Sequence, residues 1–185
     1  MFNFIRYGHE RKLINKDIEL DEEQRAILEI KINDKTEILS PFYLDKKEVI
    51  NEEFASFLDN AIKAVPPKKK INIKLTCENM SKDEEEICVK AIRNYYYNKT
   101  IDTQRRIKNN SMIFGLMIIL SILSLVALFL VEYFNAFWLI TEIFDIIAWV
   151  FVWEAVDIIA FQRSLIIYER NRHLALYNAK ISFDK

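Results

Sequence analysis

The stretch TEIFDIIAWVFVWEAVDII, residues 141–159, is apolar enough to cross a membrane, yet it carries four acidic residues and no Lys or Arg. The acids are Glu142, Asp145, Glu154 and Asp157. The apolar segment around them extends over residues 137–160. Because a helix of about 20 residues spans the hydrocarbon core of a bilayer, this segment predicts a transmembrane helix with an unusual number of ionisable side chains.

A second apolar segment precedes it. Residues 111–131, SMIFGLMIILSILSLVALFLV, contain no charged side chain and are also long enough to cross a bilayer. The residues between the two segments, EYFNA at 132–136, have the composition of a short polar and aromatic turn. The sequence therefore predicts a transmembrane helical hairpin over residues 111–160.

The charges beside these segments predict how the hairpin is oriented. Positive residues lie beyond both outer ends and none lies in the turn: Arg105, Arg106 and Lys108 come before, and Arg163, Arg170 and Arg172 come after. By the positive-inside rule, both termini face the cytoplasm. The first residues, MFNFIRYGHERK, lack the apolar core of a signal peptide. We expect a cell-membrane protein with two membrane-spanning helices.

Residues 1–110 are charge-rich and have the pattern of a small domain with strands and helices. RAILEIKIN at 25–33 and KKKINIKLTCE at 68–78 alternate apolar and polar residues, as half-buried strands do. TEILSPFYL at 36–44 reads as a further strand with Pro41 at an edge or end. Between them a helix is predicted at about 46–64, with an apolar face that includes Phe54, Phe57 and Leu58.

A capping box predicts where the next helix begins. Ser81 is followed three residues later by Glu84, and no Gly or Pro interrupts the chain until Gly115. We therefore expect this helix to continue into the first membrane segment. The tyrosines at 95–97 are interpreted as closing the core of the small domain.

The last residues are predicted to return to that domain. Residues 163–179 have helical character, and KISF at 180–183 alternates like a strand. The fold class is then α+β: a cytoplasmic domain at 1–110 with helices on one face of a sheet, a two-helix transmembrane hairpin at 111–160, and a returning helix and short strand at 161–185.

A projection of the second membrane helix at about 100° per residue separates its side chains into faces. The four acids share one half with Trp149 and Trp153. The other half is uncharged and suits lipid; it holds Ile140, Phe144, Ile147, Phe151 and Ile158. Thr141, Ala148 and Ala155 form a seam of small residues at one border, which we assign to packing against the first membrane helix.

Three hypotheses account for acids inside a membrane. Copies of the chain assemble with the acidic face inward around a wet path, since rings of Asp or Glu select cations. Alternatively, protonated acids donate hydrogen bonds within a dry seam, for example to Ser121 or Ser124, or pair with indole N–H groups of Trp149 or Trp153. The third hypothesis is a partner protein with basic transmembrane residues, because this chain has none in the span.

Composition argues against several other classes. The formal net charge of −1 gives no reason to expect a nucleic-acid partner. Cys77 and Cys88 fit neither a redox motif nor a metal-ligand pair, so no metal or cofactor is predicted. No hydrolase or nucleotide-binding motif occurs, and two glycines cannot form a phosphate-binding loop. We therefore do not expect an enzyme.

These observations favour a small, homo-oligomeric integral membrane protein whose acidic intramembrane face lines a cation or proton path. The alternative is a membrane-anchored sensing or interaction module whose cytoplasmic α+β domain binds a partner. The run WVFVWEAVDIIAFQR, the helix before the double proline and the closing NAKISF together resemble a group of small, uncharacterised bacterial membrane proteins with two transmembrane helices. That resemblance implies one architecture from end to end and brings no activity or assigned site.

Overall fold

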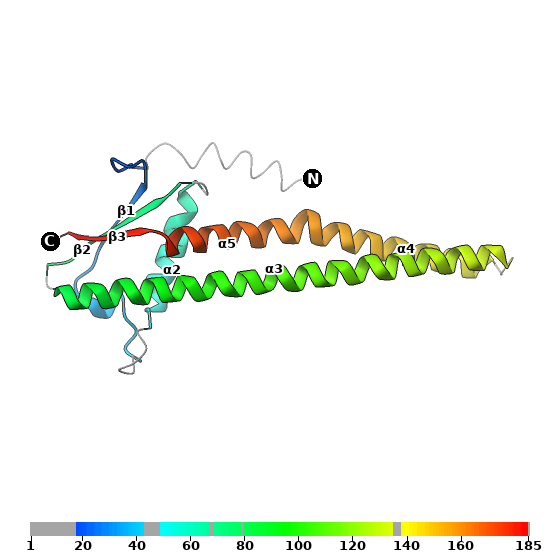
Figure 1. Cartoon of the computed structure of the whole chain (residues 1–185), viewed down its shortest axis with the longest axis horizontal. Helices are drawn as coiled ribbons and strands as arrows, with labels where there is room; N and C mark the ends of the chain where they lie inside the picture. Colours follow the sequence, from blue (N-terminus) through cyan, green and yellow to red (C-terminus); the bar gives the residue numbers. More distant parts are fainter. Residues whose placement is uncertain (1–17, 43–48, 67–68, 79, 135–137, 185) are drawn as a thin grey trace. The chain divides into compact units, whose positions relative to one another are not determined.

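The computed structural model describes residues 18–42, 49–66, 69–78, 80–134 and 138–184. It divides into two compact units, one of residues up to Thr100 together with Arg170–Lys185, the other of Ile101–Glu169 (Figure 1). The amino-terminal segment, the start of the predicted 46–64 helix, Pro67, the last two residues of the predicted turn at 132–136 and the first residue of the segment at 137–160 lie outside the described residues.

The first unit is built on a three-stranded sheet in the order β1-β2-β3, with β1 at Ala26–Lys31, β2 at Ile71–Thr76 and β3 at Lys180–Asp184. Both neighbouring pairs are parallel, with Ile30 opposite Leu75 and Leu75 opposite Phe183. Parallel neighbours require crossover connections. The first crossover contains α2 at Glu52–Ala61 with a 3₁₀ turn, η2 at Ile62–Ala64. The predicted return of KISF to the sheet is confirmed.

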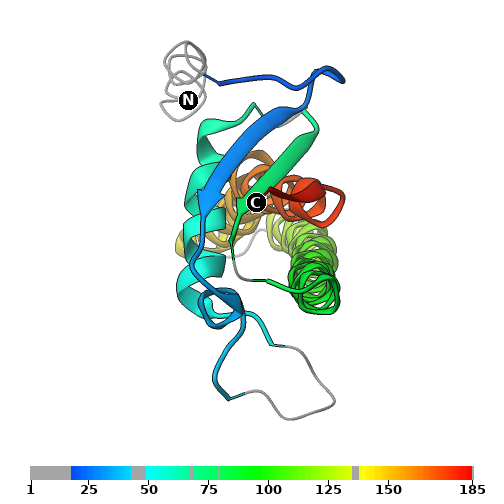
Figure 2. The same ribbon diagram turned by 90° about the vertical axis from the view of Figure 1, so that its left-hand side faces the viewer.

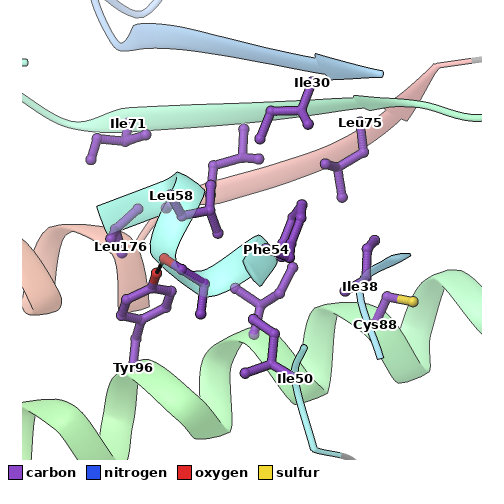
Figure 3. Close-up of a cluster of buried hydrophobic side chains, with 14 of the residues drawn as sticks. Ile30, Ile38, Ile50, Phe54, Leu58, Ile71, Leu75, Cys88, Tyr96 and Leu176 are labelled. Atoms are coloured by element: carbon purple, nitrogen blue, oxygen red, sulfur yellow. Dashed lines mark hydrogen bonds between the residues drawn. The ribbon is translucent and has the colours of Figure 1, made fainter. Parts of the chain in front are cut away.

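Helices cover one face of this sheet. Alternate strand residues, among them Ile30, Ile71 and Leu75, point at side chains of α2 and of the helix that follows β2 (Figure 3). Figure 2 shows β1 and β2 as neighbouring arrows with α2 behind them. The opposite face is polar, with the ammonium of Lys74 3.6 Å from a carboxylate oxygen of Glu29. The alternation predicted for both strands is therefore the alternation of a sheet with one buried face.

The prediction of a further strand at 36–44 is wrong. Within its described part the chain forms a 3₁₀ turn, η1 at Lys35–Glu37, and a single bridge pairs Leu39 with Ile50. The Asp34 carboxylate accepts a hydrogen bond of 2.6 Å from the backbone N–H of Thr36, which holds the chain in a turn. Ile38 is fully buried, so its apolar character serves the core without a strand.

The α2 face differs from the prediction at one aromatic residue. Phe54 and Leu58 are buried as expected, but Phe57 is 52 % exposed. The buried arc of α2 is instead completed by Ala55, which is fully buried. The tyrosine run divides in a similar way, because Tyr96 is fully buried and Tyr97 is exposed.

The long helix α3, at Lys82–Tyr133, begins at the predicted capping box. The Ser81 hydroxyl accepts from the Glu84 backbone N–H, and the Glu84 carboxylate accepts from the Ser81 backbone N–H at 3.1 Å. The helix passes Gly115 without a break, as the sequence predicts, and belongs to the first unit up to Thr100 and to the second beyond it. Among the described residues, α3 is the helix that is long and apolar enough to cross a membrane.

The second unit also contains α4, at Trp138–Asp157. A π-helical turn, η3 at Ile158–Gln162, joins it without a break to α5 at Arg163–Tyr177. α4 carries four acids within its 20 residues, so length and composition alone do not make it a second span.

Candidate functional site

The candidate site in the second unit is the acidic face of α4. The opposite side of α4 is packed and positions this face. Ala148 and Ala155 are 2 % exposed, and Thr141 is half-buried. Burial of such small side chains requires a closely packed neighbouring helix. Two hydroxyls of α3, those of Ser121 and Ser124, are buried in the same unit. Small residues on α3 and α4 thus allow these helices to lie close together (Figure 1).

The acids lie away from this packed side. Glu142, Asp145 and Glu154 are exposed, and the indoles of Trp149 and Trp153 are 63 % and 66 % exposed. At about 100° per residue, the centre of the acidic face points roughly opposite to the buried side chains. The structure therefore keeps the acids and tryptophans together on one face and leaves that face uncovered by α3.

The prediction for the uncharged half of α4 needs a correction. Ile158 is buried, and Phe144 and Phe151 are half-buried, so protein covers part of this half of α4. Ile140 and Ile147 are more exposed. The physical reason is that the alanines admit a close neighbour, whose flanks then cover the larger side chains on either side.

Asp157 differs from the other three acids because the π-helical turn holds it. The Gln162 side-chain amide donates to an Asp157 carboxylate oxygen at 2.9 Å, five residues along the chain. The oxygen of the same amide lies 3.4 Å from the Asn110 side-chain nitrogen on α3. Farther along, Arg106 of α3 and Glu169 of α5 form an ion pair of 2.9 Å. Polar contacts therefore join the helices at this end of the unit.

In the residues that the structure describes, none of the acids is hydrogen-bonded to Ser121 or Ser124. The buried serines and the exposed acids are on different sides of the helix pair. The geometry therefore does not support the form of the dry-seam hypothesis in which serines of α3 in the same chain are the hydrogen-bond partners of the acids. No cluster of three or more His, Cys, Asp or Glu that could hold a metal occurs within the described ranges.

The first unit contains a partly buried polar cluster that the sequence did not point to. The Lys99 ammonium lies 2.8 Å from a carboxylate oxygen of Asp59 and 5.0 Å from the centre of the Tyr95 ring. The Tyr96 hydroxyl donates to the carbonyl oxygen of Ala55 at 3.2 Å (Figure 3). These contacts join α3 to α2 across 40 residues of sequence, so no local pattern could have revealed them.

Burial and charge shift the pKa values in this unit. Desolvation, with the nearby Asp59 carboxylate, raises the pKa of Tyr96 far above its usual range, so the phenol stays protonated. Burial lowers the pKa of Lys99, but hydrogen bonds with Asp59 and Tyr95 outweigh this effect and the net pKa is raised. Burial raises the pKa of the Cys88 thiol to about 11, so this cysteine is an unreactive core residue.

Two shallow grooves also open on the first unit. One, of about 800 Å³, lies between α3 and β3 and is lined by apolar residues that include Val89, Tyr97 and Phe183, with charged residues of α3 around them. The other, of about 680 Å³, lies at the start of β2 and β3. Its charged lining residues are all basic: Arg25, Lys69, Lys70, Arg93 and Lys180.

No protein family, curated protein or solved structure matches the chain.

Proposed function

We propose that the apolar part of α3 and the whole of α4 cross a membrane as a helical hairpin, and that copies of the chain assemble with the acidic face of α4 turned inward. The assembled acids line a path for cations or protons. The conclusion depends on one observation: Glu142, Asp145 and Glu154 of α4 are exposed together with both tryptophans, on the face that α3 of the same chain leaves uncovered.

The energetic argument concerns what covers that face in a membrane. An acidic side chain at the centre of a bilayer costs about 2.5–3.5 kcal/mol on insertion scales. No Lys or Arg occurs between Lys108 and Arg163, so this chain offers no basic partner at that depth. A second copy supplies a polar environment in place of lipid, and self-assembly places equivalent acids around a common axis.

The spacing of the acids suits a path. Asp145 and Glu154 are nine residues apart, which is about 13 Å along the helix axis. Glu142 and Asp157 lie beyond them, so the acidic levels extend over about 22 Å in all. Symmetric copies turn each level into a ring of carboxylates, and such rings attract cations and repel anions. Trp149 and Trp153 lie between the two inner levels.

The same proposal assigns a location. The Arg and Lys residues that precede the apolar part of α3 and follow α4 favour a cytoplasmic position for both termini in the cell membrane. Lipid is then the partner of the exposed apolar side chains of α3, such as Met112 and Phe129.

The test is ion flux into proteoliposomes that contain the full chain, with the oligomeric mass measured in nanodiscs. We expect a discrete oligomer and a cation or proton flux that falls at least tenfold in the double variant Asp145→Asn with Glu154→Gln. The matched control is Glu132→Gln, which removes an exposed acid at the end of α3, off the α4 face. Its flux should equal that of the wild type.

A monomer without flux would overturn the proposal. A wild-type monomer that binds a basic transmembrane peptide would assign the acidic face to a partner protein instead. A monomer that binds no such peptide would favour a membrane-anchored module acting through its first unit. An oligomer that conducts nothing and dissociates in the double variant would make the acids assembly contacts.

A further inference from the structure

The outer edge of β3 carries backbone groups that the sheet does not use. β3 is an edge strand, and its other side pairs with β2. The Asp184 carbonyl accepts from the Cys77 backbone N–H, so Asp184 and the alternate residues Ser182 and Lys180 direct their backbone groups toward β2. Ile181 and Phe183 consequently direct theirs outward. In the part of the chain that the structure describes, no backbone partner meets these outward groups.

The sequence of the strand is complementary to itself in the antiparallel direction. Its five residues are Lys-Ile-Ser-Phe-Asp at 180–184. When two copies pair about Ser182, Lys180 of each lies opposite Asp184 of the other, and Ile181 lies opposite Phe183. Opposite charges and apolar pairs are the cross-strand neighbours that stabilise antiparallel strands. No other register of the strand on itself places Lys opposite Asp.

The hydrogen-bond pattern selects the same register. With Ser182 opposite Ser182, the outward groups of Ile181 in one copy face those of Phe183 in the other. Each such pair exchanges two backbone hydrogen bonds, and the two-fold axis generates the second pair. Lys180 and Asp184 then occupy non-hydrogen-bonded positions, where side chains approach most closely.

The groove beside β3 accommodates the added strand. Ile181 and Phe183 are half-buried and share the groove with Val89, Tyr97 and Tyr177. The Tyr97 and Tyr177 rings lie 5.8 Å apart. A strand that extends the sheet past β3 places its own Ile and Phe over this apolar lining, where they displace water. An uncovered edge of this kind otherwise promotes uncontrolled association.

We propose that β3 is a self-association strand: two copies of the chain join their sheets by antiparallel β3–β3 pairing centred on Ser182. The inference concerns the first unit alone and goes beyond the proposed ion path, because it holds whether or not the α4 acids conduct. The partner of the outer edge of β3 is a second copy of this chain. The charged and apolar residues of the strand identify it, because they are complementary to those of a second, antiparallel copy.

The test is disulfide trapping of the full chain in detergent micelles, where the orientation of the hairpin in a bilayer does not restrict pairing. In the proposed register the two Ser182 Cα atoms are about 4.5 Å apart, within reach of a disulfide. Ser182→Cys should therefore give a covalent dimer on mild oxidation. The matched controls are Lys180→Cys and Asp184→Cys, whose equivalent positions lie about 13 Å apart along the strands and should not cross-link. A mixture of these two controls should give the heterodimer. The native Cys77 and Cys88 are buried, so the wild type gives the background.

Charge reversal tests the register by a second route. In the Ser182→Cys protein, Lys180→Asp places like charges opposite each other and should reduce cross-linking about tenfold. Adding Asp184→Lys restores opposite charges and should restore the yield. Cross-linking of Lys180→Cys as readily as Ser182→Cys would overturn the register. A Ser182→Cys protein that forms no dimer, or that cross-links only to a protein of another mass, would overturn self-association.

Discussion

Replacement of Leu58 by alanine should destabilise the first unit and so increase the fraction of molecules in which it is open. The complete burial of Leu58 determines the size of this increase. Leu58 has no exposed surface and lies in the core between α2 and the sheet (Figure 3). Leu58→Ala removes three carbons, which costs about 2 kcal/mol of transfer free energy. The cavity that remains adds about 1–2 kcal/mol. The sum of about 3–4 kcal/mol corresponds to a roughly 300-fold increase in the opening equilibrium.

The chain provides a reporter for this opening. Cys88 is fully buried in the same core, and its high pKa keeps the thiol unreactive while the core is closed. Maleimide modification of Cys88, in full chain carrying Cys77→Ser in nanodiscs, therefore measures opening of the first unit. When closing is faster than modification, the modification rate follows the opening equilibrium.

The control is Phe57→Ala, one residue away on α2. Because Phe57 is 52 % exposed, its truncation leaves a solvent-filled site and no cavity. We expect the modification rate to rise only about fivefold, from partial loss of buried area. An increase for Leu58→Ala below about tenfold, or one no larger than that of Phe57→Ala, would refute the assignment of Leu58 to the centre of this core.

Three further predictions follow from individual contacts. Tyr96→Phe removes the hydroxyl that donates to α2 and should cost about 1 kcal/mol, seen as a roughly fivefold faster Cys88 modification; an unchanged rate would contradict it. The Lys35 side chain and the Ser81 cap hold the pKa of Glu84 at about 2, below its ordinary 4.5. This stabilisation is complete above pH 4.5 and is lost as the pH falls toward 2, so Glu84→Gln should flatten the loss of helical circular dichroism over that range. In the second unit, Ala155→Leu should overpack a site that is 2 % exposed and cost about 1–3 kcal/mol, seen as a lower thermal midpoint in nanodiscs. Val156→Leu, at an exposed position, should leave that midpoint unchanged.

The polar cluster on α3 and the acidic face on α4 illustrate two different uses of charge. Lys99 and Asp59 are partly buried partners that join α2 to α3, and removal of either breaks this link between the two helices. The acids of α4 have no basic partner within their apolar segment. Charged groups without a partner of opposite charge are more informative about function than charged groups that have one.

The local elements of this chain are determined by its sequence. The capping box at Ser81 and Glu84 places the start of α3, and the absence of Pro together with a single Gly lets the helix continue to Tyr133. Alternation identifies β1, β2 and the returning β3. The clustering of the four acids on one side of α4 also follows from spacing alone, since helical geometry fixes the angle between any two residues on one helix.

The tertiary structure decided which of these faces meet. Spacing places a seam of small residues on α4, but it cannot tell how far the packed arc extends beyond Ala148 and Ala155, and the burial of Ile158 is known only from the structure. The segment at 36–44 has the apolar content of a strand, but Asp34 forms a turn and Ile38 enters the core from it. The Asp59–Lys99 pair and the open edge of β3 depend on contacts between residues far apart in sequence. Such contacts arise only when the whole chain has folded, because no local pattern encodes which distant residue becomes a neighbour.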